Sequence, residues 1–341
     1  MPMKSILAAG AAVGVLSVVM PVQAQETVNA VMERGALRCG VNTGLAGFSN
    51  PDSEGNWEGL DVDVCRAIAA AMLGDPDAVE FTPLTAQQRF TALQSGEVDV
   101  LSRNTTWTLT RDTSLGLNFA PVTFYDGQGF MVPADLGVTS ALELSGATVC
   151  VQPGTTTELN LADYFRANEM EFEPVVIEQI DEVNAAFFAG RCDVYTTDAS
   201  GLASIRATVA PNPADYIILP EIISKEPLGP VVRHGDDQFF DIVKWTVYAL
   251  IEAEELGVTS ENLEEMMGSS NPSVQRLLGV TPGMGEALGL SESWAHDAIA
   301  AVGNYGEIFE RNVGVNTPLA LERGINDLWT RGGLMYAMPI R

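Results

Sequence analysis

Short apolar strand patterns alternate with helix patterns twice along this chain, and this alternation constrains the fold more than any other feature. The first series has strand patterns at 36–41, 79–83 and 98–101, with helix patterns at 28–35, 64–73 and 85–95. The pattern restarts after Asp135, with strands at 147–152, 172–177 and 193–197 and helices at 156–167, 181–189 and 200–208. Alternation of strand and helix is typical of a parallel sheet covered by helices. The sequence therefore predicts two α/β lobes in series, with a cleft between them.

Two extended apolar stretches, 123–133 and 216–232, are interrupted by glycine or proline, and we expect them to cross between the lobes. A long helix pattern at 239–255 would then return to the first lobe. The expected division of the chain is a signal peptide at 1–24, a first lobe at 25–126 and 228–270, a second lobe at 127–227, and a C-terminal helical extension at 271–341.

The N-terminus has the pattern of a secretory signal peptide. Lys4 supplies a positive charge, residues 6–20 form an apolar run, and Val22-Gln23-Ala24 is a small-x-small cleavage site. A membrane anchor is the alternative, but the apolar run is short for a span, and no later segment is apolar enough. We therefore expect an exported protein, cleaved near Ala24, whose mature chain is not inserted in a membrane. The net charge of −27 disfavours nucleic acid as a partner.

Export also permits disulfide bonds, and the chain has four cysteines: Cys39, Cys65, Cys150 and Cys192. Four cysteines allow three pairings. If the two halves of the pattern are separate lobes, Cys39–Cys65 and Cys150–Cys192 are the natural pairs. Four buried thiols are the alternative. A zinc site is not expected, because there is no C-x-x-C motif and the chain has only two histidines.

The segment after the predicted strand at 98–101 concentrates groups that bind anions. It contains two arginines, an asparagine and several threonines between Arg103 and Arg111. Open α/β sheets bind ligands at the carboxyl ends of their strands. Cations and hydroxyl groups gathered there, in a strongly acidic chain, suggest a pocket for a small carboxylate.

Four segments together resemble the solute-binding proteins of polar amino-acid ABC transporters, which have the type II periplasmic fold of two lobes and two hinge strands. They are Glu58–Val64 before an alanine-rich helix, Arg89–Val100, Thr106–Arg111 as a T-x-T-x-x-R motif, and Val151–Glu158 as a G-T-x-x-E loop. Leu60 replaces the aromatic residue of the family's first motif. The segments Gly40–Ser49 and Leu101–Thr108, and the long C-terminal tail, resemble the general L-amino-acid-binding subgroup, which includes glutamate, glutamine, aspartate and asparagine binders.

The resemblance implies a role for each residue of the predicted ligand site. Arg111 occupies the position that binds the ligand α-carboxylate, where a guanidinium can pair with both oxygens. Asn104 and Thr106 occupy positions beside the ligand, and Thr155 and Thr156 begin a second-lobe helix whose free N–H groups attract an anion. Asp198 matches the aspartate that binds the α-ammonium, although it could instead cap the helix from Ser200.

Selectivity for the side chain would come from the first lobe. Arg89 matches an arginine that faces the side-chain carboxylate in acidic amino-acid binders, and Asn42 lies where relatives differ and can donate or accept. Such a site could hold Glu, Asp, Gln or Asn. Arg103 could contact the ligand or form a salt bridge, and Thr197 replaces a histidine found in some relatives. Asp61 and Asp63 are expected to cap a helix and pack the lobe, because two carboxylates alone do not make a calcium site.

The implied partners are an L-amino acid and the membrane permease subunits of an ABC transporter, with no cofactor, no metal and no catalytic residue. The implied location is the periplasm. Two other functions remain open. An exported dehydratase-like enzyme on the same scaffold would need an acid or base beside the arginines, and a receptor's sensory module would need a signalling segment. The extension after Asn271 could pack on the first lobe, dimerise or contact the transporter.

Overall fold

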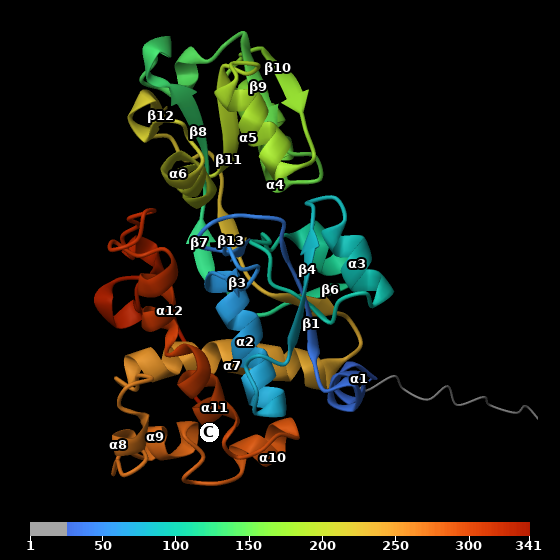
Figure 1. Ribbon diagram of the computed structural model, residues 1–341, viewed down its shortest axis with the longest axis vertical. Helices are drawn as coiled ribbons and strands as arrows, with labels where there is room; N and C mark the ends of the chain where they lie inside the picture. Colours follow the sequence, from blue (N-terminus) through green and yellow to red (C-terminus); the bar gives the residue numbers. More distant parts are fainter. Residues whose placement is uncertain (1–25) are drawn as a thin grey trace, which may run out of the picture.

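The computed structural model describes residues 26–341, so the predicted signal peptide at 1–24 lies outside the described residues. Two five-stranded sheets, each with its own helices, form two lobes that are stacked along the long axis of the molecule (Figure 1). The predicted α/β fold of two lobes is confirmed. Among residues 26–341, no helix is both long enough and apolar enough to cross a membrane.

The sheet of the first lobe has the strand order β4-β1-β5-β14-β6. Its strands are β4 (Val79–Leu84), β1 (Leu37–Asn42), β5 (Val100–Leu101), β14 (Val231–Arg233) and β6 (Leu117–Phe119). Strands β4 and β5 both run parallel to β1, whereas β14 returns from the second lobe and is antiparallel to its neighbours. The helices α1 (Glu26–Arg34), α2 (Leu60–Leu73), α3 (Arg89–Ser95) and α7 (Asp237–Glu255) belong to this lobe.

The sheet of the second lobe repeats this plan with the order β10-β9-β11-β8-β12. Its strands are β10 (Phe172–Val176), β9 (Ala147–Val151), β11 (Val194–Asp198), β8 (Gln128–Pro133) and β12 (Tyr216–Ile218). Strands β10 and β11 are parallel to β9, and β8 is antiparallel to β11 and β12. The helices are α4 (Thr156–Ala167), α5 (Ile180–Phe188) and α6 (Ala199–Thr208). Because β9 and β11 are parallel, their carboxyl ends share one edge of the sheet.

Two short antiparallel strands connect the lobes. β7 (Phe124–Asp126) pairs with β13 (Glu226–Leu228), and together they form a separate two-stranded ribbon between the large sheets. The predicted crossing segments contain these strands, but each also contains strands of the lobe sheets: β8 in the first segment, and β12 and the start of β14 in the second. We call β7 and β13 the hinge strands.

Two helix starts were predicted wrongly. α2 begins at Leu60 rather than Val64, directly after Gly59, whose φ of 128° few other residues can adopt. α3 begins at Arg89 rather than Thr85. The reason is a reciprocal pair of hydrogen bonds, in which the backbone N–H of Thr85 donates to Gln88 Oε1 and that of Gln88 donates to Thr85 Oγ1. This pair holds residues 85–88 in a turn ahead of the helix.

Both predicted cysteine pairs are bonded in the structure. Cys39 on β1 is joined to Cys65 on α2, and Cys150 on β9 is joined to Cys192 just before β11. No free cysteine remains in the described chain. Each bond closes a loop within one lobe, so the cross-links stabilise the lobes separately and leave the connection between them free to bend.

The C-terminal extension packs on the first lobe. It contains α9 (Pro272–Leu277), α10 (Met284–Leu288), α11 (Trp294–Val302) and α12 (Tyr305–Asn312) and lies beside α2 and α7 (Figure 1). Trp294 is fully buried there. Arg311 and Asn312 both donate to Asp63 on α2, each over 2.6 Å, so Asp63 fixes the extension to the lobe. Arg323 also pairs with Glu254 at the end of α7.

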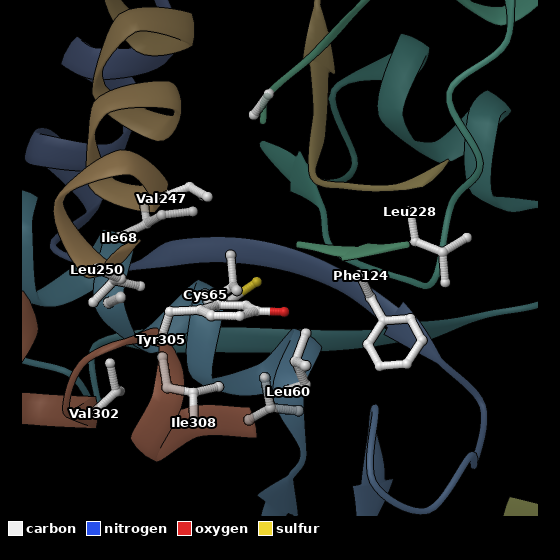
Figure 2. Close-up of a cluster of buried hydrophobic side chains, with 14 of the residues drawn as sticks. Leu60, Cys65, Ile68, Phe124, Leu228, Val247, Leu250, Val302, Tyr305 and Ile308 are labelled. Carbon is white, nitrogen blue, oxygen red and sulfur yellow. The ribbon is translucent and has the colours of Figure 1, made fainter. Parts of the chain in front are cut away.

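The same extension contacts the hinge. Figure 2 shows Tyr305 of α12 in one apolar cluster with side chains of α2 and α7 and with Phe124 and Leu228, which come from the two hinge strands. The Tyr305 hydroxyl donates to the carbonyl of Thr123 over 2.8 Å. Asn326 binds the backbone of Tyr125 on β7 twice, accepting from its N–H at 2.6 Å and donating to its carbonyl at 3.0 Å. Asn326 therefore covers the free edge of β7 as a neighbouring strand would.

We predict that Asn326→Ala destabilises the protein by about 2 kcal/mol, because it leaves two backbone groups of a part-buried strand without partners. Urea denaturation of the mature protein measures the change. Asn316→Ala is the matched control, since Asn316 is an exposed residue of the same extension. Equal stability of the two variants would contradict the proposed role of Asn326 at the hinge.

Candidate functional site

A cavity lies between the two lobes, at the carboxyl ends of β1 and β11 and at the start of α4. Its free volume is about 30 Å³. Residues from both lobes line it: Asn42, Leu45, Ala86, Arg89, Arg103, Asn104 and Thr106 from the first lobe, and Gln152, Thr155, Thr156, Thr157, Ile180, Tyr195, Thr197, Asp198, Ser200, Gly201 and Ile205 from the second. We call this the central cavity.

Contacts across the lobes close the central cavity. The hydroxyl oxygens of Thr106 and Thr156 are 3.3 Å apart, one in each lobe. Thr85 donates to Glu178 over 2.7 Å, and Ser204 donates to the carbonyl of Ala46 over 2.8 Å. The structure is therefore a closed form, in which the cavity is small because the walls already touch.

A buried carboxylate shapes the first-lobe wall. Asp61 on α2 accepts from the backbone N–H of Asn104 at 2.7 Å and from the Ser102 hydroxyl at 3.1 Å. Burial raises the pKa of Asp61 to about 6, while these hydrogen bonds oppose the rise. Asn104 has a φ of 34°, a strained value for a residue with a side chain, and accepts at its Oδ1 from Asn42 over 2.9 Å. Asp61 thus holds the loop that presents Asn104 and Asn42 to the cavity.

Three buried arginines lie around this wall. Arg89 Nη1 donates to the hydroxyl of Thr105 over 3.4 Å, and its Nε has no hydrogen-bond partner. Arg103 Nε donates to the carbonyl of Leu84 over 2.9 Å. Burial lowers the pKa of Arg89 well below its usual range. Burial also lowers the pKa of Arg103 to about 10, while the carboxylate of Asp61 opposes this decrease. So much positive charge out of water requires anions nearby.

Arg111 belongs to the same group but lies behind the cavity wall. It sits in the π-helical turn Thr110–Ser114, its Nη1 donates to the carbonyl of Thr106 over 2.9 Å, and it is not among the lining residues. The guanidinium carbons of Arg89 and Arg111 lie 4.9 and 5.0 Å from the centre of the Phe90 ring. Burial lowers the pKa of Arg111 to about 10, while Glu226 and Asp198 favour its charged form.

Carboxylates from the second lobe and the hinge face these arginines. Asp198 ends β11 and is buried, and burial followed by the charges of Asp126 and Glu226 raises its pKa well above the usual range. It makes no side-chain cap to α6, so the alternative capping role is not what the structure shows. Asp126 accepts from the Ser200 hydroxyl and from the N–H of Gly127, and burial raises its pKa to about 6.

Glu226, on hinge strand β13, joins the lobes and was not predicted from the sequence. Its Oε2 accepts from the hydroxyls of Thr106 at 2.6 Å and Thr156 at 2.8 Å. Its Oε1 accepts from Asn160 at 2.8 Å and Ser224 at 2.6 Å. One fully buried carboxylate therefore takes four hydrogen bonds, from the first lobe, the second lobe and the hinge.

The second-lobe wall is built by the turn before α4. Gly154 has a φ of 73°, and Thr155 then caps the helix by accepting from the N–H of Glu158 over 3.0 Å. The cap leaves the first turn of α4, with Thr156, facing the cavity. Tyr195 on β11 lines the same wall, and its buried hydroxyl has no partner.

Seven of the eight predicted ligand residues line the central cavity: Asn42, Arg89, Asn104, Thr106, Thr155, Thr156 and Asp198. Arg111 is the exception. Sequence reasoning missed Glu226 and Tyr195. A glutamate within the apolar crossing segment was a usable signal for Glu226, whereas Tyr195 in a buried strand carries no sign that its hydroxyl lacks a partner.

Comparison with known proteins agrees with this geometry. Residues 37–262 match the family model for bacterial extracellular solute-binding proteins, family 3. The chain is 60% identical over 340 residues, 99% of both chains, to the general L-amino acid-binding periplasmic protein AapJ of Rhizobium johnstonii. It is 60% identical over 316 residues, 92% of this chain and 93% of the relative, to the glutamate/glutamine/aspartate/asparagine-binding protein BztA of Rhodobacter capsulatus.

A solved structure is similar over nearly its whole length. It is an ABC transporter periplasmic binding protein from Brucella ovis with glutathione bound, 58% identical in sequence. The superposition has a TM-score of 0.90 and covers 92% of this chain and 99% of that one.

We predict that Glu226→Ala lowers the free energy of unfolding by about 3 kcal/mol, because four donors lose their acceptor and the buried Arg89 and Arg111 lose an anion. Glu226→Gln keeps the shape and should lose less. Glu182→Ala, at an exposed position of the same lobe, is the control. Urea denaturation gives the comparison, and a Glu226→Ala variant as stable as the control would contradict the role of this carboxylate.

Proposed function

We propose that this chain, which belongs to family 3 of the bacterial extracellular solute-binding proteins, is the periplasmic receptor of an amino-acid ABC importer. It captures L-amino acids with acidic or amide side chains by closing its two lobes about the hinge strands. The observation that carries this proposal is the central cavity itself, where buried arginines and a buried aspartate face each other across the closed lobes. A dipolar molecule with one carboxylate and one ammonium is the complement of such a site.

The α-carboxylate is assigned to Arg111, Thr106 and Thr156. The two threonine hydroxyls already converge on a carboxylate, that of Glu226, at 2.6 and 2.8 Å. Each hydroxyl has one proton, so a threonine that donates to the ligand releases Glu226, whose Oε1 still accepts from Asn160 and Ser224. Arg111 adds positive charge from directly behind Thr106, where burial makes a charge-assisted hydrogen bond stronger than it would be in water.

The α-ammonium is assigned to Asp198. Burial and two neighbouring carboxylates disfavour the charged form of Asp198. An ammonium group placed against it favours the charged form again. Ligand binding thus relieves an unfavourable arrangement that closure alone creates, which is a reason for the lobes to close more firmly when the ligand is present.

Side-chain selection is assigned to Arg89 and Asn42. The unpartnered Nε–H of Arg89 suits a side-chain carboxylate or amide oxygen, and Asn42 offers a donor and an acceptor. A site of this kind does not reject an amide in favour of an acid. The names of the Rhizobium and Rhodobacter relatives support this ligand class, and the glutathione in the Brucella structure supports a range that extends past free amino acids.

The remaining assignments follow the family. The mature protein, beginning near Gln25, acts in the periplasm and delivers its ligand to membrane permease subunits. Residues 25–126 and 228–270 form the first lobe, 127–227 the second, and 271–341 the extension. The enzyme alternative is not favoured: His234 directly follows β14 and His296 lies on α11, so neither lines the central cavity, and Asp198, the acidic group that does line it, is assigned to the ligand ammonium.

We predict that Arg111→Ala weakens glutamate binding about 10- to 100-fold, the usual effect of losing a hydrogen bond between charged groups. Calorimetric titration of ligand-free, refolded mature protein with glutamate, glutamine, aspartate, asparagine and leucine measures this. Arg166→Ala is the control, since that arginine is exposed in the second lobe. Absence of heat with every amino acid, from a well-folded sample, would sink the proposed ligand class.

A further inference from the structure

The threonine hydroxyls assigned to the ligand α-carboxylate are bonded to a carboxylate of the protein itself. Thr106 of the first lobe and Thr156 of the second both donate to Oε2 of Glu226, over 2.6 and 2.8 Å. A hydroxyl has one proton to donate. A threonine that donates to Glu226 therefore cannot donate to a ligand carboxylate at the same time.

The backbone keeps Glu226 beside the first-lobe donor. The N–H of Trp107 donates to the carbonyl of Pro227 over 2.8 Å, and Thr106 forms an antiparallel bridge with Leu228. The loop that contains Thr106 is thus joined to hinge strand β13 on both sides of the contact. Glu226 is also only 1% exposed. Its carboxylate therefore stays close to the threonines, and a ligand that binds them has to share this space with it.

The charge of Glu226 acts on the groups assigned to the ligand. Burial lowers the pKa of Arg111, and Glu226 opposes this decrease more than Asp198 does. A ligand oxygen that accepts from Thr106 or Thr156 lies within about 6 Å of Glu226 Oε2, because both oxygens are then within about 3 Å of the same hydroxyl. Two carboxylates this close in a buried site repel each other.

We infer that Glu226 is a built-in competitor of the ligand α-carboxylate and lowers the affinity of the central cavity for amino acids. The inference rests on the proposed function, because it uses the α-carboxylate position assigned there. The hydrogen bonds from Thr106 and Thr156 to Glu226 stabilise only the state in which neither threonine donates to a ligand, so they oppose binding. Binding is then an exchange of one carboxylate for another at the same two donors.

A different role for Glu226 would have an effect of the opposite sign. A carboxylate in this position could accept from the ligand α-ammonium, together with Asp198. Removing the charge of Glu226 would then weaken binding, whereas removing the charge of a competitor strengthens it. The direction of the change in affinity distinguishes the two roles.

Calorimetric titration of the mature Glu226→Gln variant with glutamate and glutamine tests the inference. The substitution removes the negative charge and keeps the shape of the side chain. We expect both ligands to bind about tenfold more tightly than they bind the wild type, which is the low end of the contribution of a hydrogen bond to a charged group. Both ligands have an α-carboxylate, so the gain should be similar for the two. Glu182→Gln, at an exposed position of the second lobe, is the control and should leave both affinities unchanged.

A second variant and a second measurement separate competition from a structural role. Glu226→Asp keeps the charge but is one methylene shorter, which withdraws it from the threonines, and it should tighten binding less than Glu226→Gln does. Urea denaturation of the same proteins should show that both variants are less stable than the wild type, because hydrogen bonds of Glu226 are lost or weakened. Stability and affinity therefore change in opposite directions, whereas a residue with only a structural role would lower both.

The outcomes distinguish this inference from the proposed function. If the wild type binds glutamate and glutamine, and the folded Glu226 variants bind them equally or more weakly, the inference is overturned although the proposed function stands. If the folded wild-type protein binds neither amino acid, the proposed function fails and the inference fails with it.

Discussion

Three buried arginines and the four carboxylates near them, those of Asp61, Asp126, Asp198 and Glu226, are the constraint on which the rest of the structure depends. Charges out of water are tolerated only when they are paired and hydrogen-bonded. Glu226 meets this requirement for the hinge by taking four hydrogen bonds, and Asp126 takes bonds from Gly127 and Ser200. Arg89 and Asp198 meet this requirement less completely. The Arg89 Nε–H has no hydrogen-bond partner, and the raised pKa of Asp198 means that its charged form is disfavoured. A dipolar ligand supplies an acceptor for the Arg89 Nε–H and a positive charge for Asp198.

The hinge must bend while the lobes stay rigid, and the chain separates these two demands. Each disulfide lies within one lobe, and among residues 26–341 the strands β7 and β13 form a separate ribbon between the lobes. The C-terminal extension packs on the first lobe and also binds β7 through Asn326 and Tyr305. The end of the hinge that contains Thr123 and Tyr125 is thereby fixed to the first lobe.

The sequence predicted what depends on local pattern. The alternation of strands and helices predicted the two lobes, and the positions of the cysteines predicted the disulfide pairs. Resemblance to short family motifs predicted seven of the residues that line the central cavity. It did not predict what depends on the closed arrangement of distant segments. Glu226 meets Thr106 and Thr156 from 120 and 70 positions away along the chain. The position of Arg111 behind Thr106 and the two hydrogen bonds of Asn326 to β7 likewise depend on contacts between segments that are distant in sequence.

The most direct test of this account is a crystal structure of the mature protein with L-glutamate bound. The account predicts a closed form with the α-carboxylate within hydrogen-bond distance of Arg111 and Thr156, the α-ammonium on Asp198, and the side chain directed toward Arg89 and Asn42. A glutamate bound with its α-carboxylate away from the arginines, or outside the space between the lobes, would contradict it.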